Sequence, residues 1–335
     1  MQTSRWFIVA TGAVMSAALI AGQVVNLWFA GALRDLPSTE HVTLDLTQSI
    51  RILDREGGEL YRVTQDEDRT SLALEEIPAN FLHAIVDIED ERFFERGGCI
   101  DIQGIARAAW RNFVSGEASE GASTITQQLV RSLYLQPDKT LARKVREIAI
   151  ACRLEGALSK EEILTLYVNR VAFGNRAYGL EQAAQTYFNT RAADLTLAQA
   201  AVLAALPQRP SYFDPYGPHL RTAIEPETQD ALQAGTLKAE DVPRSELATG
   251  LLPRRVKAGS GEMVLDGRAA LVLKAMRRNG HLTDEQEAAA RGQLETMAFA
   301  PPKRIALEAP HFVFWVREQL DALMAEDGRG REWAA

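Results

Sequence analysis

Acidic, amide and basic side chains gather between Glu89 and Gly174 at spacings that an ordinary core helix does not need. Glu89 and Asp90 follow one apolar helical pattern, and Glu147 lies on another. Two carboxylates on separate helices can divide general-acid and general-base work when their environments differ. Nearby arginines and lysines can hold phosphate groups. The region therefore predicts an active site for an anionic sugar substrate.

Hydroxyl and amide side chains dominate the stretch between these acids. Ser123, Thr124, Gln127 and Gln128 can hydrogen-bond sugar hydroxyls or phosphate oxygens. Ser123 or Thr124 can also cap a helix that begins at Ile125, and the two uses are compatible.

Each feature has a plain structural explanation when it is taken alone. Glu89 and Asp90 can form a solvated helix end, although the helix dipole disfavours carboxylates there. Arg143 and Lys144 precede Glu147 by four and three residues, which is also the spacing of a surface ion pair. Their occurrence together in one region is what favours catalysis.

The elements that must position these groups are mainly helical. Phe81, Ile85 and Ile88 predict an amphipathic helix that ends near Glu89. A second helix begins after Thr140, and its apolar residues predict one buried stripe. The stripe consists of Leu141, Val145, Ile148 and Cys152, and it leaves Arg143, Lys144 and Glu147 on another face.

Capping boxes mark three further helix starts. They are Ser159–Glu162, Thr196–Gln199 and Thr283–Gln286. The box at Thr196 opens an Ala-rich helix, whose small side chains predict close helix packing. Ile105–Val114 combines aromatic and apolar residues with arginines, which suits a membrane surface or an ordinary core helix.

The first 34 residues predict a membrane anchor. No charge occurs between Arg5 and Arg34, and Trp6–Leu33 exceeds the roughly 20 apolar residues that a bilayer requires. Ala30–Ala32 resembles a cleavage site, so a removed signal peptide is the alternative. The length of the run favours a single-pass anchor, with the bulk of the protein outside the cytoplasm.

Composition narrows the function classes. A net charge of −8 argues against nucleic acid as a partner, and 46% hydrophobic residues suffice for a sizeable core. Cys99 and Cys152 lack metal-ligand spacing, and the sequence does not decide whether they form a disulfide.

The expected organisation has four parts. Residues 1–34 form the cytoplasmic tip and anchor, and residues 35–75 form a linker with a β-hairpin around Gly57-Gly58. Residues 76–300 form the main domain, with an acidic, partly ordered insertion at about 217–262. Residues 301–335 read as a linker or the start of a missing C-terminal domain.

The motifs together resemble those of the peptidoglycan glycosyltransferases, family 51, of class A penicillin-binding proteins and their monofunctional relatives. The matching stretches are Glu89–Gly98, Gly121–Gln128, Arg143–Glu147 and Ile163–Asn169. The chain departs from the usual family pattern at Arg96 (for His), Ala122 (for Gly), Arg131 (for Lys) and Thr165 (for Glu in many members).

The resemblance implies a lysozyme-like α-helical domain with a membrane-embedded jaw at Ile105–Ser119. Glu89 would be the general base that takes the proton of the 4-hydroxyl of lipid II. That hydroxyl attacks the anomeric carbon of the growing glycan with inversion, and polyprenyl diphosphate leaves. Glu147 would be the second catalytic acid, beside the diphosphate sites formed with Arg131, Arg143 and Lys144.

The resemblance also implies the remaining site residues and partners. Substrate-binding residues would be Asp90, Ser123, Thr124, Gln127, Gln128, Arg131, Arg143, Lys144 and Asn169. A divalent cation, magnesium or manganese, with ligands that the sequence does not reveal, would assist the leaving group. Partners would be lipid II, the growing lipid-linked glycan, the membrane and other cell-wall synthesis proteins. Periplasmic location on the bacterial inner membrane follows.

Two alternatives remain open at this stage. A lysozyme-like hydrolase would use the same carboxylates without the cationic residues, and a non-catalytic wall-assembly scaffold would result if Arg96 disabled Glu89. Ser-x-x-Lys and Lys-Thr-Gly motifs are absent, so no transpeptidase or penicillin-binding activity is expected of this chain.

Overall fold

The structure is a computed structural model that describes residues 71–115, 123–134, 140–238, 241–243 and 246–302, parts of 50–63 and 311–319, and the positions Gln23 and Gly31. The expected anchor at 6–33 and nearly all of 303–335 lie outside the described residues. Within the described part, no helix is both long and apolar enough to span a bilayer.

Helices make up most of the regular structure, which confirms the prediction of a mainly α protein. The helices are α2 (Ala79–Glu89), α3 (Ile102–Ser115), α4 (Ile125–Tyr134), α5 (Leu141–Ala157), α6 (Lys160–Arg170), α7 (Leu180–Phe188), α8 (Leu197–Ala205), α9 (Pro226–Gln233), α10 (Arg268–Arg278) and α11 (Asp284–Glu295), with short 3-10 turns η2 (Leu74–Glu76) and η3 (Ala192–Asp194). The strands are β1 (Ile50–Leu53), β2 (Glu59–Val63), β3 (Ala223–Ile224), β4 (Leu247–Ala248), β5 (Arg254–Ala258) and β6 (Gly261–Leu265).

The chain forms two compact units. Unit 1 comprises residues 1–43 and 96–163, and unit 2 comprises residues 44–95 and 164–335. The predicted β-hairpin is confirmed as the antiparallel pair β1–β2.

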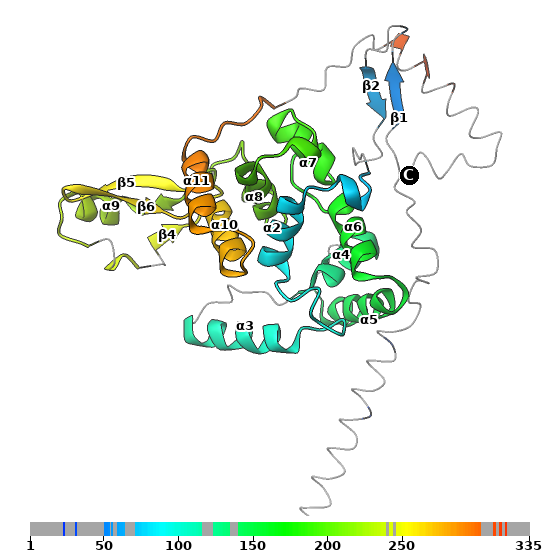
Figure 1. Cartoon of the computed structure of the whole chain (residues 1–335), viewed down its shortest axis with the longest axis horizontal. Helices are drawn as coiled ribbons and strands as arrows, with labels where there is room; N and C mark the ends of the chain where they lie inside the picture. Colours follow the sequence, from blue (N-terminus) through cyan, green and yellow to red (C-terminus); the bar gives the residue numbers. More distant parts are fainter. Residues whose placement is uncertain are drawn as a thin grey trace, which may run out of the picture. The chain divides into compact units, whose positions relative to one another are not determined.

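The core of unit 2 is built around α8, which packs against α2, α10 and α11 (Figure 1). Most residues of α8 are fully buried alanines or small aliphatics, so its neighbours can approach closely. The Thr196–Gln199 capping box opens this helix as predicted, and Thr283–Gln286 opens α11 in the same way. This packing fixes α2, whose last residue is Glu89.

The expected acidic insertion is more regular than its composition indicated. It contains the antiparallel pairs β3–β4 and β5–β6 and the helix α9. A small apolar cluster of Ile224, Leu232, Val256 and Leu265 holds these elements together. The widely spaced apolar residues belong to several short elements, so no single period reveals them.

Unit 1 pairs α4 with α5, and here the predicted buried stripe is wrong. Leu141 is 79% exposed. The buried residues of α5 are Glu147, Ile150, Ala151 and Leu154. Val145, Ile148 and Cys152 are only half-buried, so the fully buried face of α5 is rotated away from the predicted stripe. The interior face of α5 therefore carries Glu147.

Helix α3 turns its large apolar residues toward solvent. Ile102, Trp110 and Phe113 are 76%, 69% and 82% exposed, whereas the small residues Gly104 and Ala108 are on the buried side. A core helix would show the reverse pattern, so the structure excludes the core interpretation of this segment.

Candidate active site

Glu89 lies at the C-terminal end of α2, in unit 2, and forms an ion pair with Arg268 of α10. The Arg268 Nη2 atom lies 3.1 Å from the Glu89 Oε1 atom, and both side chains are at most 10% exposed. A buried carboxylate that accepts from a guanidinium is held in one orientation.

Arg268 is itself fixed by the surrounding backbone. Its Nε–H donates to the carbonyl of Ala205 at 3.0 Å. It follows Gly267, where an added Cβ would stand 2.3 Å from the carbonyl carbon of Leu252. Glycine therefore permits the close approach that places Arg268 at the first turn of α10. Burial lowers the pKa of Arg268, and the charge of Glu89 opposes that effect.

Sequence reasoning missed Arg268. The two partners are 179 residues apart, and no local spacing connects them. The available signal in the sequence was an arginine directly after a glycine at the start of an apolar helical pattern. Asp90 is the residue that caps the C-terminus of α2, and its buried side chain excludes the interpretation as a solvated helix end, while its expected substrate contact stays a prediction.

Glu147 forms a second centre, in unit 1, between two cations. Its Oε1 atom lies 2.5 Å from Lys144 Nζ, and its Oε2 atom lies 3.3 Å from Arg131 Nε. The Glu147 side chain is 1% exposed, whereas those of Lys144 and Arg131 are 38% and 43% exposed. The alternative of a surface ion pair is therefore excluded, because the acid is buried while the cations reach solvent.

Lys144 has its three ammonium hydrogens matched by three acceptors. Besides Glu147, its Nζ donates to Ser123 Oγ and to Gln127 Oε1, each at 2.9 Å. The structure thus brings together the hydroxyl and amide stretch and the cationic motif, as the sequence predicted.

Thr124 acts as the helix cap that the sequence offered. Its Oγ1 accepts from the backbone N–H of Gln127 at 3.2 Å. Gln128 follows within α4, where its backbone N–H donates to the Thr124 carbonyl. Arg143 lies in the first turn of α5, capped by Thr140 Oγ1. Substrate contacts of Thr124, Gln128 and Arg143 stay predictions.

Asn169 links two segments of unit 2 through hydrogen bonds of its side-chain amide. Its Oδ1 accepts from the backbone N–H of Leu72 at 2.8 Å, and its Nδ2 donates to the carbonyls of Leu72 and Thr165. Both amide hydrogens are thereby satisfied within the chain. This arrangement favours a positioning role, and its expected substrate contact stays a prediction.

The described residues contain no group of three His, Cys, Asp or Glu side chains that could hold a metal ion. They therefore do not provide a protein cage for the expected divalent cation. A cation that is bound mainly by phosphate oxygens needs fewer side chains.

Comparison with known proteins identifies the relatives of the chain. The penicillin-binding protein 1A of Escherichia coli is 41% identical over 217 residues, which cover 64% of this chain and 25% of that protein. Its counterpart in Vibrio cholerae is 46% identical over 158 residues, which cover 47% of this chain and 19% of that protein. The chain thus spans about a quarter or less of the length of these curated relatives.

A solved structure of penicillin-binding protein 1A from Haemophilus influenzae matches 84% of this chain and 25% of its own, at 17% identity and a TM-score of 0.40. At that TM-score the match carries no conclusion about the fold. The sequence model of the family described as Transglycosylase matches residues 56–233, which is more than half of the chain and includes Glu89 and Glu147. The chain belongs to the transglycosylase family.

Proposed function

We propose that the protein is a peptidoglycan glycosyltransferase, which polymerises lipid II into glycan strands with inversion and release of polyprenyl diphosphate. The observation that carries the proposal is the Glu147 centre, where two partly exposed cations surround a buried carboxylate inside the matched family region. Such a centre suits the diphosphate of a lipid-linked sugar.

In this mechanism Glu89 is the general base. It takes the proton of the acceptor 4-hydroxyl as that oxygen attacks the anomeric carbon. The ion pair with Arg268 orients the carboxylate.

We assign binding of the departing diphosphate to Arg131, Lys144 and Arg143 of unit 1. Charge that develops on the leaving oxygen is stabilised by these preorganised donors. Glu147 holds Lys144 and Arg131 in place and limits the net positive charge of the centre. Dependence of polymerisation on a divalent cation is tested by adding a chelator.

The membrane forms the third part of the proposal. The exposed apolar face of α3 supports contact with a bilayer surface, and the N-terminal run supports a single-pass anchor with the catalytic part in the periplasm. Both fit a substrate that is itself held in the bilayer.

The test uses the full chain in detergent with labelled lipid II and magnesium or manganese. We expect glycan polymer and released polyprenyl diphosphate. Cleavage of preformed glycan without polymer would support the hydrolase instead, and inertia toward both substrates would support the scaffold.

A further inference from the structure

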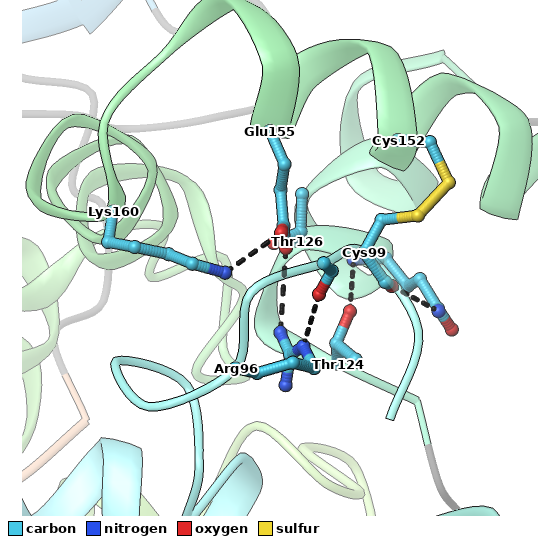
Figure 2. A network of polar contacts seen from close by, with 9 residues as sticks. Arg96, Cys99, Thr124, Thr126, Cys152, Glu155 and Lys160 are labelled. Carbon is cyan, nitrogen blue, oxygen red and sulfur yellow. Dashed lines mark hydrogen bonds and ion pairs between the residues drawn. A yellow bond between two sulfur atoms is a disulfide. The ribbon is translucent and has the colours of Figure 1, made fainter. Parts of the chain in front are cut away.

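Two bonds tie the segment that precedes α3 to helix α5. The Cys99–Cys152 disulfide joins Cα atoms 4.8 Å apart, and Arg96 Nη2 lies 3.4 Å from Glu155 Oε1 (Figure 2). Cys152 and Glu155 both belong to α5, three residues apart. The segment Arg96–Cys99 is therefore held to α5 at its first and last residues.

The ion pair is part of a nearly buried polar network. Arg96 and Glu155 side chains are 8% and 7% exposed. Glu155 also accepts from Thr126 Oγ1 at 2.5 Å and from Lys160 Nζ at 2.8 Å. Burial alone would raise the pKa of Glu155, but the hydrogen bonds from Lys160 and Thr126 and the charges of Lys160 and Arg96 hold that pKa below its usual value. Arg96, which replaces the usual family histidine, thus has a defined structural partner.

The side chain of Gln127 connects the segment Arg96–Cys99 to the Glu147 centre. The Gln127 Nε2 donates to the main-chain carbonyl of Cys99 at 3.2 Å, and its Oε1 accepts from Lys144 Nζ at 2.9 Å. A carbonyl can only accept and an ammonium can only donate. The Gln127 amide therefore has one orientation that satisfies both neighbours.

We propose that the Cys99–Cys152 disulfide and Arg96 position Lys144 and Glu147 for catalysis through the side-chain amide of Gln127. The inference rests on the proposed function, because it assigns positioning residues to the same reaction. The disulfide fixes the Cys99 carbonyl, which orients Gln127. Gln127 then holds the Lys144 ammonium against Glu147.

The neighbouring residues explain why a covalent tie is needed. Gly97 and Gly98 directly precede Cys99, both are exposed, and no atom lies within 4 Å of a Cβ built at either position. Such a glycine pair leaves the backbone with many alternative conformations. Without the disulfide, the position of the Cys99 carbonyl would depend on non-covalent contacts such as the Arg96–Glu155 pair and the Gln127 hydrogen bond.

Reduction provides a reversible way to open the tie. Two thiol groups of dithiothreitol transfer two electrons and two protons to the disulfide. Cys99 and Cys152 become thiols while dithiothreitol becomes a cyclic disulfide. After removal of the reductant, added oxidised glutathione accepts two electrons and two protons from the thiols and re-forms the bond, so one preparation serves as its own control.

The test compares lipid II polymerisation by the oxidised full chain and by the Cys99→Ser/Cys152→Ser variant. We expect kcat to fall about tenfold, with KM changed less than twofold, because geometry is lost rather than binding charge. Dithiothreitol should produce the same loss in the wild type, reversed on reoxidation, and should leave the double variant unaffected.

A merely structural disulfide would lower stability without coupling to Gln127. We therefore repeat the comparison in a Gln127→Ala background, where removal of the disulfide should lower kcat by less than twofold further. If the losses of kcat from removing the disulfide and from Gln127→Ala were fully additive, the proposed positioning through Gln127 would be wrong. Leu154→Ala removes a fully buried side chain of the same helix and is the matched control for lost stability. Its kcat, measured at a temperature below the melting temperature of the variant, should equal that of the wild type.

Arg96 is tested separately, because the double cysteine variant can lose folded protein. Arg96→Ala should lower kcat severalfold, and Arg96→Lys should restore part of it. If oxidised wild type polymerises lipid II and the reduced protein keeps full kcat, the inference fails while the proposed function stands. If oxidised wild type forms no polymer, the proposed function fails first.

Discussion

The two buried carboxylates differ in the cations that accompany them. Glu147 is paired with Lys144 and Arg131, whose side chains are 38% and 43% exposed. Glu89 is paired with Arg268, whose side chain is only 10% exposed. A partly exposed cation can exchange a partner for a ligand, whereas a buried one is committed to its carboxylate. In the proposed mechanism, this difference in exposure suits ligand binding at the first centre and orientation of the base at the second.

The largest expected effect comes from removing the base itself. Glu89→Gln keeps the size of the side chain and should lower kcat by about 10²–10⁴-fold, because an amide cannot accept the proton. Polymer formation from labelled lipid II measures the change. Glu91→Gln is the matched control, since Glu91 lies two residues away and pairs with Arg278 at 3.1 Å. Near-normal polymerisation by the Glu89 variant would remove Glu89 from the mechanism.

Loss of the Arg268 guanidinium should lower both kcat and the stability of the fold. Arg268→Met keeps much of the volume but leaves Glu89 as a buried charge, which costs about 3–5 kcal/mol of unfolding free energy. We expect kcat to fall by about 10²-fold with little change in KM. Thermal unfolding and steady-state kinetics measure the two effects.

A double variant separates these consequences of losing Arg268. Glu89→Gln/Arg268→Met removes both charges and should regain much of the stability without regaining activity. A mainly KM effect in Arg268→Met would show that the guanidinium binds substrate, and the contrast between the centres would be lost.

The exposed cations should give the opposite kinetic pattern. Arg131→Ala should raise KM for lipid II about tenfold while kcat changes less, because a charge-assisted contact to the diphosphate is lost. The difference from wild type should shrink at high salt. Arg255→Ala in β5 is the control, since it removes an exposed guanidinium that pairs with Glu262 and Glu295. Unchanged binding by Arg131→Ala would place the diphosphate elsewhere.

The Glu147 centre was predictable because its parts are local. Lys144 and Glu147 are three residues apart, and Ser123 and Gln127 share a recognisable motif. The capping boxes and the β-hairpin also follow from short-range patterns. Short-range patterns therefore sufficed for one centre, for the starts of α8 and α11 and for the β-hairpin.

The Glu89 centre was only half predictable, because its partner comes from a distant helix. Arg268 reaches Glu89 only through the packing of α2, α8 and α10. The wrong face of α5 has a related cause, since apolar periodicity counts Glu147 as a surface residue. Glu147 can be buried because Lys144 and Arg131 pair with its carboxylate. Apolar periodicity carries no information about such pairs.

The smallest expected effect concerns the joint between α2 and α10, which supports the Glu89 centre. The buried carboxylate of Asp87 accepts from Asn279 at 2.9 Å and lies 2.7 Å from His281 Nδ1, and His83 stacks on His281 at 4.0 Å. Burial and the neighbouring His281 lower the pKa of His83, against the opposing charge of Asp87. A histidine whose pKa is lowered by folding takes up protons more readily when unfolded. Its contribution to stability is therefore present above pH 6.5, the unfolded pKa, and is lost as the pH falls toward the lowered folded pKa.

We expect acidification from pH 7.5 to 5.5 to lower the melting temperature of the wild type more than that of His83→Gln, by on the order of 1 °C. Equal losses in the two proteins, measured by thermal unfolding across this range, would show that His83 does not couple the joint to pH.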